Sequence, residues 1–308
     1  MALFKKKENT EEVADDLTVD IPAQPRTWEF NTKIELKDVS FGYTADKLVL
    51  RDVNLTIDKP GFYCIVGPNG VGKSTIVKCL NKINIPQKGE IFVDGVNIKD
   101  LHYKDLAQKI GYVPVFSNDT FAMSVVDTIL VGRFNHTKEC SREENLKKVY
   151  EAMRLLHVEG LAYKKFNEIS AGQHQKVAIA RGIVQETPVL ILDEPTANLD
   201  VKYQVYVMEI LRAIAEKRNM IVLTISHDLN ITAKYAHQVI MLSKPGVIHA
   251  VGTPQEVLTK ENITHVYGVN CRIIEDDQCV SNPNVDSETK VSVPHIILGE
   301  ALVIDDDQ

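Results

Sequence analysis

Residues 67–75 have the composition and spacing of a loop that binds phosphate. They fit the pattern G-x-x-x-x-G-K-[ST], in which glycines let the backbone curl so that successive N–H groups point at an anion. Lys73 can reach the β- and γ-phosphates of a nucleotide, and the Ser74 hydroxyl can hold Mg²⁺. The positive end of the helix that follows would face the same anion. The loop consists of Gly67, Pro68, Asn69, Gly70, Val71, Gly72, Lys73, Ser74 and Thr75.

Two carboxylates that follow an apolar run could complete a hydrolytic site. Asp193 and Glu194 close the run 189–192, which is typical of a buried parallel strand. The carboxyl end of such a strand faces the crevice where ligands bind. Asp193 could hold Mg²⁺ through water, and Glu194 could polarise an attacking water as a general base. Solvated acids at a strand end are the plainer alternative, and Lys73 upstream argues against it.

Three further features have residue types suited to a nucleotide site. His227 follows the apolar run 220–225, so it is expected at the same sheet edge, where its imidazole could contact the γ-phosphate or orient the water. Tyr43 could stack on a base, although a surface or core tyrosine is nearly as good an interpretation. The segment Ser170-Ala171-Gly172-Gln173 precedes a helical pattern and could be an anion site or an ordinary N-cap.

Bulk composition restricts the class of protein. The chain has 308 residues, of which 44% are hydrophobic and 25% charged, as expected for a globular protein with a substantial core. Its net charge of −7 argues against a nucleic-acid partner held by a broad basic surface. The five cysteines are scattered and include no C-x-x-C pair, so we expect free thiols in a reducing cytoplasm, with Cys64 and Cys79 buried.

No segment is predicted to cross a membrane. No apolar stretch reaches the length that a bilayer requires. The basic start at residues 5–7 is followed by acidic residues and lacks the apolar core of a signal peptide. If the protein serves a membrane, we expect it to do so as a peripheral subunit.

The elements that must position the phosphate loop alternate between β and α. A short apolar run at 62–66 predicts a strand before the loop, and a helix is predicted through 76–80 after it. The runs 189–192 and 220–225 suit central strands of a parallel sheet that is covered on both faces. Strand, glycine loop and helix are the setting that a phosphate loop needs.

Other patterns predict elements around this core. Strands at 34–41, 49–57 and 89–93 indicate a small antiparallel sheet beside it. Ser141 and Glu144 form a capping box for a helix over residues 141–156. No internal repeat is evident, so one nucleotide domain is expected. Outside it we predict a disordered leader at 1–32 and a polar, partly irregular extension at 267–308 with one strand at 294–298.

Taken together, these motifs resemble those of the ATP-binding subunits of ABC transporters. The resemblance spans residues 34–266 and has each family motif in the family's order. It implies an α/β fold: a P-loop NTPase (RecA-like) core, an antiparallel β flank and a helical ABC-specific subdomain near 117–172, in one ATPase domain over 33–266. The motifs are the aromatic Tyr43, the Walker A loop 67–75, the signature 169–173, Walker B 189–194, the D-loop 197–200 and the switch His227.

The resemblance also implies a reaction and a second copy of the chain. In this family two domains pair head to tail, and the signature of one closes on the ATP that the Walker A loop of the other holds. Ser170 and Gly172 would supply donors to that γ-phosphate, with Gln173 and the D-loop Asp200 expected at the same site. ATP and Mg²⁺ are the implied cofactors, and ADP and phosphate are the products.

Further segments are similar to the branch of the family that powers uptake of iron chelates, haem and cobalamin. These are residues 110–114, 125–133, 252–258 and 266–269. The similarity implies a separate membrane permease, an extracytoplasmic substrate-binding protein and a location at the cytoplasmic face of the cell membrane. Two alternatives remain open. One is a soluble ABC ATPase of translation or DNA repair, and the other is a degenerate subunit that traps ATP with weak turnover.

Two residues depart from the family pattern. Val115 stands where the family usually has the Q-loop glutamine that touches Mg²⁺ and links the nucleotide site to the permease. Valine has no donor or acceptor and can do neither, and Asn118, three residues on, is out of register. Ala171 replaces the first glycine of the signature, a milder change because Gly172 remains.

Overall fold

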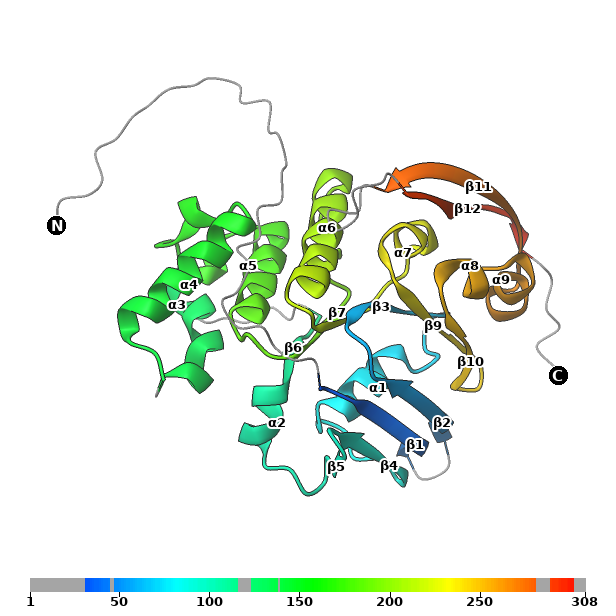
Figure 1. Ribbon diagram of the computed structural model, residues 1–308, viewed down its shortest axis with the longest axis horizontal. Helices are drawn as coiled ribbons and strands as arrows, with labels where there is room; N and C mark the ends of the chain where they lie inside the picture. The colour runs from blue at the N-terminus through cyan, green and yellow to red at the C-terminus, as the bar shows by residue number, and fades with distance from the viewer. Residues whose placement is uncertain (1–30, 45–46, 116–122, 138, 281–288, 302–308) are drawn as a thin grey trace.

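A computed structural model of the chain describes residues 31–44, 47–115, 123–137, 139–280 and 289–301 (Figure 1). For 276–280 and 289–292 it describes the backbone alone. Most of the predicted leader at 1–32 and the whole of Asn118 therefore lie outside the described residues. The first strand begins at Ile34.

The centre of the molecule is a predominantly parallel sheet. Among the described residues it has six strands in the order β10-β9-β3-β8-β7-β6. All neighbouring pairs are parallel except β9 and β10, which are antiparallel. This arrangement confirms the predicted α/β core. The strands are β3 (Gly61–Val66), β6 (Ile110–Val113), β7 (Val189–Asp193), β8 (Ile221–Ile225), β9 (Gln238–Ser243) and β10 (Val247–Gly252).

Alternation along β3 divides the interior into two cores. Phe62, Cys64 and Val66 contribute to one hydrophobic cluster, whereas Tyr63 and Ile65 contribute to the other. Successive strand residues point to opposite faces, so a strand covered on both sides is apolar throughout. As predicted, Cys64 and Cys79 are free and buried, and burial raises the pKa of each thiol to about 12.

An antiparallel sheet covers one face of the parallel sheet, as predicted. Its order is β2-β1-β4-β5, and its side chains share a cluster with helix α1 (Lys73–Leu80). The four strands found in the described residues are β1 (Ile34–Thr44), β2 (Lys47–Ile57), β4 (Lys88–Val93) and β5 (Val96–Asn97).

Helices cover the other face and extend to one side as a separate group, green in Figure 1. Helix α4 begins after Ser141, whose hydroxyl and the Glu144 carboxylate form the predicted capping box. Helices α3 and α4 pack on α5, so the helical group continues beyond residue 172 to the end of α5. It contains α3 (Val125–Leu130), the 3-10 helices η1 (Val131–His136), η2 (Glu159–Leu161) and η3 (Phe166–Glu168), α4 (Arg142–Leu155) and α5 (Ala171–Ile183).

The remaining helices follow the core strands. α6 (Val201–Lys217) lies between β7 and β8, and α7 (Leu229–Tyr235) lies between β8 and β9. α2 (Tyr103–Lys109) precedes β6, and α8 (Pro254–Val257) and α9 (Lys260–Tyr267) follow β10. No helix in the described ranges is long and apolar enough to cross a membrane.

The C-terminal extension differs from the prediction of an irregular segment with one strand. Strands β11 (Val269–Val280) and β12 (Thr289–Ala301) form an antiparallel hairpin that includes the predicted strand at 294–298. The acidic stretch 275–277 interrupts the apolar alternation of β11, so periodicity missed this strand. Strand β11 forms nevertheless, because its backbone pairs with β12 and β-propensity depends strongly on the neighbouring strand.

Candidate active site

The phosphate loop is shaped by glycines in backbone conformations that other residues avoid. Gly67 has φ +149° and Gly72 has φ +110°. A Cβ at Gly67 would lie 2.5 Å from the carbonyl oxygen of Leu242, and one at Gly72 would lie 2.6 Å from Leu50 Cδ2. The loop therefore leaves β3 and enters α1 along a path that only glycine permits. Helix α1 begins directly at Lys73.

Lys73 is held inside this loop. Its Nζ donates to the carbonyl oxygen of Gly67 at 2.7 Å and to that of Pro68 at 2.9 Å. Burial lowers the pKa of Lys73, whereas the charges of Glu194 and Asp193 act in the opposite direction. The ammonium group is thus fixed where a phosphate would meet the loop, facing two carboxylates.

Ser74 and Asp193, the two residues expected to hold Mg²⁺, are in contact. The Ser74 hydroxyl donates to Asp193 Oδ1 at 3.3 Å, joining the start of α1 to the end of β7. Burial and the neighbouring charge of Glu194 raise the pKa of Asp193, and they outweigh the Ser74 hydrogen bond and the charges of Lys78 and His227, which lower it. A hydroxyl and a carboxylate are hard oxygen ligands, so these two residues fit the implied Mg²⁺.

Glu194 and His227 also lie together. Glu194 follows β7 with φ +52°, an uncommon conformation for a side chain of its size. His227 Nε2 is 2.6 Å from Glu194 Oε1. Because a carboxylate only accepts hydrogen bonds, Nε2–H is the donor. Both side chains are partly exposed, so they are accessible at the edge of the sheet where Lys73 and Asp193 lie.

Gln175 is a residue of this site that sequence reasoning missed. It is buried on α5, and its Nε2 donates to the backbone carbonyl of Glu194 at 3.3 Å. The signature helix is therefore joined to the end of β7 within one chain. A glutamine close to the apolar run 177–180 of this helix is the signal that could have indicated it.

Tyr43 stands beside the phosphate loop. Its hydroxyl is 3.4 Å from the Thr75 hydroxyl on α1, and its ring packs edge to face on Phe41 with 5.1 Å between ring centroids. The side chain is 61% exposed, which leaves a ring face open to a base.

The signature residues contact the D-loop and one another. Ser170 is the N-cap of α5 and makes a reciprocal capping box with Gln173. A Cβ at Gly172 would lie 3.1 Å from the carbonyl oxygen of Asn198, and Asp200 caps α6 through the Tyr203 N–H. In the described parts of the chain, no hydrogen bond or ion pair joins 170, 172, 173 or 200 to the phosphate loop.

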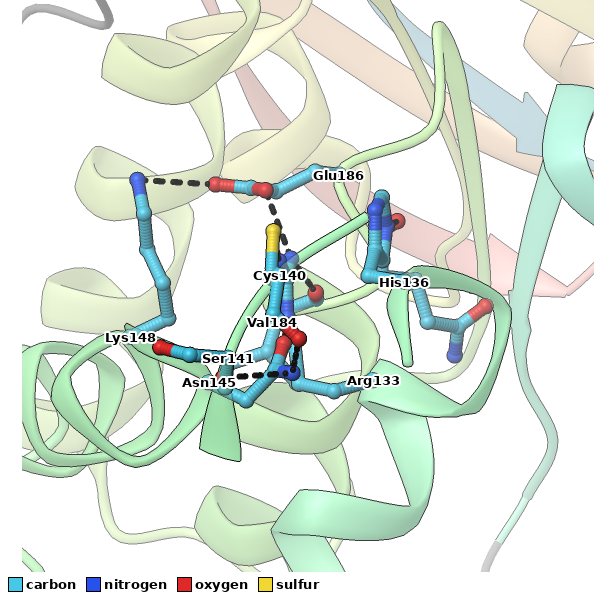
Figure 2. A network of polar contacts seen from close by, with 9 residues as sticks. Arg133, His136, Cys140, Ser141, Asn145, Lys148, Val184 and Glu186 are labelled. Carbon is cyan, nitrogen blue, oxygen red and sulfur yellow. Dashed lines mark hydrogen bonds and ion pairs between the residues drawn. The ribbon is translucent and has the colours of Figure 1, made fainter. Parts of the chain in front are cut away.

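Arg133 anchors the helical group, and Figure 2 shows its contacts. The side chain is 2% exposed. Its Nε donates to Asn145 Oδ1 at 2.8 Å, and one terminal nitrogen donates to the Val184 carbonyl at 2.8 Å and pairs with Glu186 Oε2 at 2.6 Å. Lys148 Nζ is 3.0 Å from the other oxygen of Glu186. One guanidinium thereby joins η1, α4, the end of α5 and the segment before β7.

Sequence reasoning cited Arg133 only within a stretch similar to the family. An arginine that follows the apolar run 129–131 is itself a signal, because buried arginines occur only with partners. Val115, by contrast, follows β6 and is 43% exposed. Its side chain has no polar atom that could contact the nucleotide site.

The fold and these contacts define a P-loop nucleotide hydrolase of the ABC type: a glycine loop, a hydroxyl and a carboxylate suited to a metal, a Glu–His pair, and a capped signature helix. The family described as "ABC transporter" matches residues 50–197. An uncharacterized ABC transporter ATP-binding protein of Methanocaldococcus jannaschii is 40% identical over 78% of this chain and 93% of its own length. The chain therefore belongs to the ABC transporter ATP-binding proteins, which confirms the resemblance, and it is an ATPase.

Two further comparisons point to one branch of this family. The ferric enterobactin transport ATP-binding protein FepC of Escherichia coli (strain K12) is 34% identical, over 72% of this chain and 83% of its own. The inward-facing structure of an ABC transporter described as metal-chelate type has a TM-score of 0.71 at 28% identity, and the match covers 88% of this chain and 98% of that one.

Proposed function

We propose that this chain is the ATP-hydrolysing subunit of an importer, which energises a separate membrane permease for an iron-chelate or cobalamin-type cargo. The observation that supports it best is the meeting of Glu194 and His227 at the end of neighbouring parallel strands, beside Asp193 of β7 and Lys73 at the start of α1. The names of the E. coli relative and of the metal-chelate transporter support the type of cargo.

Each residue has a separate task in hydrolysis. Lys73 and the loop N–H groups bind the β- and γ-phosphates, and Tyr43 packs on the base. Ser74 and Asp193 would hold Mg²⁺, which would neutralise charge on the phosphate oxygens. Glu194 accepts a proton from the attacking water, and the His227 N–H holds that carboxylate in place.

A second copy completes the site. Ser170, Gly172 and Gln173 stand at the start of α5. Their capping box uses the N–H groups of Ser170 and Gln173, so the Gly172 N–H and the Ser170 O–H are the donors that could face an anion. In a head-to-tail pair they reach the γ-phosphate held by the partner's loop, with Asp200 beside them.

The permease meets this subunit at the cytoplasmic face of the membrane, where the chain acts as a peripheral protein. Val131 and Phe134 of η1 and Tyr103 of α2 are large, exposed apolar side chains. Their elements adjoin, since Asn135 Nδ2 donates to the Ala107 carbonyl at 3.2 Å. Exposed apolar groups of this kind mark interaction surfaces. An extracytoplasmic binding protein delivers the cargo to the permease and does not contact this chain.

Uptake measurements test the type of cargo. Cells that lack this chain should fail to accumulate a radiolabelled ferric chelate or cobalamin, and a plasmid copy should restore uptake while the Lys73→Ala copy should not. Full uptake of both cargoes without the chain would contradict this assignment. Loss of uptake without the chain would also count against a soluble ATPase of translation or repair, because removing such a protein would not stop uptake of a specific cargo.

Val115 is the observation that favours a second candidate, a subunit that traps ATP with weak turnover. The side chain of an exposed valine can neither coordinate Mg²⁺ nor form a hydrogen bond with a water molecule. Steady-state ATPase of the purified chain, with Glu194→Gln as the reference for zero turnover, separates the two. A wild-type rate no higher than that of Glu194→Gln would establish the trap.

A further inference from the structure

Asn230 pairs with the backbone of the C-terminal hairpin in both directions. Its Nδ2 donates to the Ile296 carbonyl at 3.1 Å, and the Ile296 N–H donates to its Oδ1 at 2.7 Å. In an antiparallel strand the N–H and C=O of one residue point to the same side. Both groups of Ile296 therefore face away from β11, and the Asn230 amide takes the place of a neighbouring strand at the free edge of β12.

The backbone N–H of Asn230 is bonded to the N-cap residue of its own helix. Asp228 is the N-cap of α7, and its Oδ1 accepts from the N–H of Asn230 at 2.8 Å and from that of Ile231 at 2.9 Å. The first turn of α7 is thus fixed between its own cap and the hairpin. His227, whose Nε2 contacts Glu194, directly precedes that cap.

The hairpin packs on α7, the helix to which this turn belongs. Cys271, Val293 and Ile296 are buried in the same hydrophobic cluster as Leu229 and Ala233 of α7. α7 packs on β12 and α9 packs on β11, and Figure 1 shows the two strands arching over these helices. The hairpin is therefore anchored to two helices, and a displacement of β12 would pass to the first turn of α7.

We propose that Asn230 is a positioning residue for ATP hydrolysis, and that the C-terminal hairpin acts through it to hold His227 against Glu194. This inference rests on the proposed roles of His227 and Glu194. Positioning of a reacting group within a fraction of an ångström governs turnover without contributing to the binding of substrate. Asn230 contacts no residue of the phosphate loop in the described structure, so its effect should appear in kcat alone.

The test compares Asn230→Leu, which removes both bonds at nearly constant volume, with Asn230→Asp, which keeps an acceptor for the Ile296 N–H. Asn97→Leu is the matched control: it removes an amide that donates to Glu90 Oε1 at 3.1 Å and accepts from the Lys99 N–H at 3.0 Å, on β5 of the antiparallel sheet. In steady-state ATPase of the full chain we expect kcat to fall about tenfold for Asn230→Leu and less for Asn230→Asp, with KM for ATP unchanged. Asn97→Leu should keep the wild-type kcat.

Three outcomes would overturn the proposal. They are a wild-type kcat in Asn230→Leu, an equal loss in Asn97→Leu, and a rise in KM that accounts for the whole loss. Thermal unfolding identifies a folding defect; if Asn230→Leu unfolds at the assay temperature, Asn230→Asp decides, and a wild-type kcat there overturns the proposal.

A second measurement separates positioning of His227 from pairing of two copies. The double variant Asn230→Leu/Glu194→Gln should still form a dimer with Mg-ATP on size exclusion, because the signature and the phosphate loop are intact. Loss of that dimer would show that the hairpin acts in pairing and would overturn the proposal. If instead Glu194→Gln and His227→Ala alone keep wild-type turnover, the proposed site itself is wrong.

Discussion

Nε2 of His227 lies 2.6 Å from Oε1 of Glu194, and the two residues follow neighbouring parallel strands of the core. A histidine that donates to a carboxylate in this way fixes the direction of the carboxylate. The other oxygen of Glu194 is then available to a water molecule. Two side chains that are 33 residues apart in sequence thus act as one unit.

Glu194→Gln should separate nucleotide binding from turnover. The amide keeps the size of the side chain but cannot accept a proton from water, so kcat should fall by about 100-fold or more. Lys73, Ser74 and Asp193 are unchanged, and ATP affinity should remain. An ATP-bound dimer should accumulate on size exclusion with Mg-ATP. A monomer at every ATP concentration would count against head-to-tail pairing.

Lys73→Ala should abolish ATP binding or turnover. The ammonium group is fixed at the loop by the Gly67 and Pro68 carbonyls, and no other cation replaces it there among the described residues. We expect kcat/KM for ATP to fall by about 100-fold or more, because a preorganised charge on the phosphates is lost. Lys88→Ala, which removes an exposed lysine of β4, is the control. Near-normal kcat and KM in Lys73→Ala would refute the assignment of the phosphate loop.

Arg133→Met should destabilise the chain. It leaves Glu186 and the Val184 carbonyl without the guanidinium, and Lys148 compensates for part of the lost charge. Breaking a buried pair of this kind costs about 3 kcal/mol of unfolding free energy. Denaturant unfolding measures it, and Arg142→Met, at an exposed position of α4, should differ from wild type by less than about 0.5 kcal/mol. Equal stability of Arg133→Met and wild type would show that the network contributes nothing.

The same network predicts a pH dependence. Burial raises the pKa of Glu186, but the hydrogen bonds and charges of Arg133 and Lys148 outweigh it and hold that pKa below its ordinary value. The unfolded chain then binds the proton more readily, so this contribution is present above about pH 4.3 and is lost as pH falls through the lower folded pKa. The stability difference between wild type and Glu186→Gln should therefore shrink from pH 7 to about pH 3. A difference that is constant with pH would contradict the ion pair.

Local patterns predicted most of the core and of the site. Lys73, Asp193, Glu194 and His227 each follow an apolar run, and parallel strands bring their carboxyl ends to one edge. Contacts between elements distant in sequence were not predictable in this way. Asn230 bonds Ile296, which is 66 residues away, and neither residue has a local pattern that indicates the other.

Strand β11 was likewise not predictable from a local sequence pattern. Its residues alternate poorly, and its pairing with β12 depends on a partner strand that follows residues 281–288. The partners of Arg133 were not predictable for the same reason, since its acceptors come from two segments far from each other in sequence, at Asn145 and at residues 184–186. Periodicity reports on one element at a time, whereas burial of a polar group depends on which other elements surround it.

Val115→Gln should strengthen coupling and leave binding unchanged. Val115 is exposed after β6 and has no polar side-chain atom, whereas the family's usual glutamine touches Mg²⁺ and links the site to the permease. Its substitution leaves Lys73, Ser74 and Asp193 untouched, so ATP affinity should be ordinary. An interaction made only in the transition state changes kcat. We expect transport-linked ATPase of the assembled complex to rise about two- to fivefold, a gain of less than about 1 kcal/mol.

Asn118 provides the competing explanation for the same position. If it already fills the role of the missing glutamine by a different path of the loop, Val115→Gln will be neutral and Asn118→Ala will lower kcat in the assembled complex. The two substitutions therefore have opposite expected effects under the two explanations, and ATP affinity is the internal control for both. If neither changes transport-linked ATPase, the nucleotide site does not communicate with the permease through this loop. Coupling would then depend on contacts outside it, such as the exposed Phe134 of η1, where Phe134→Ala should lower transport-linked ATPase while the ATPase of the isolated subunit stays unchanged.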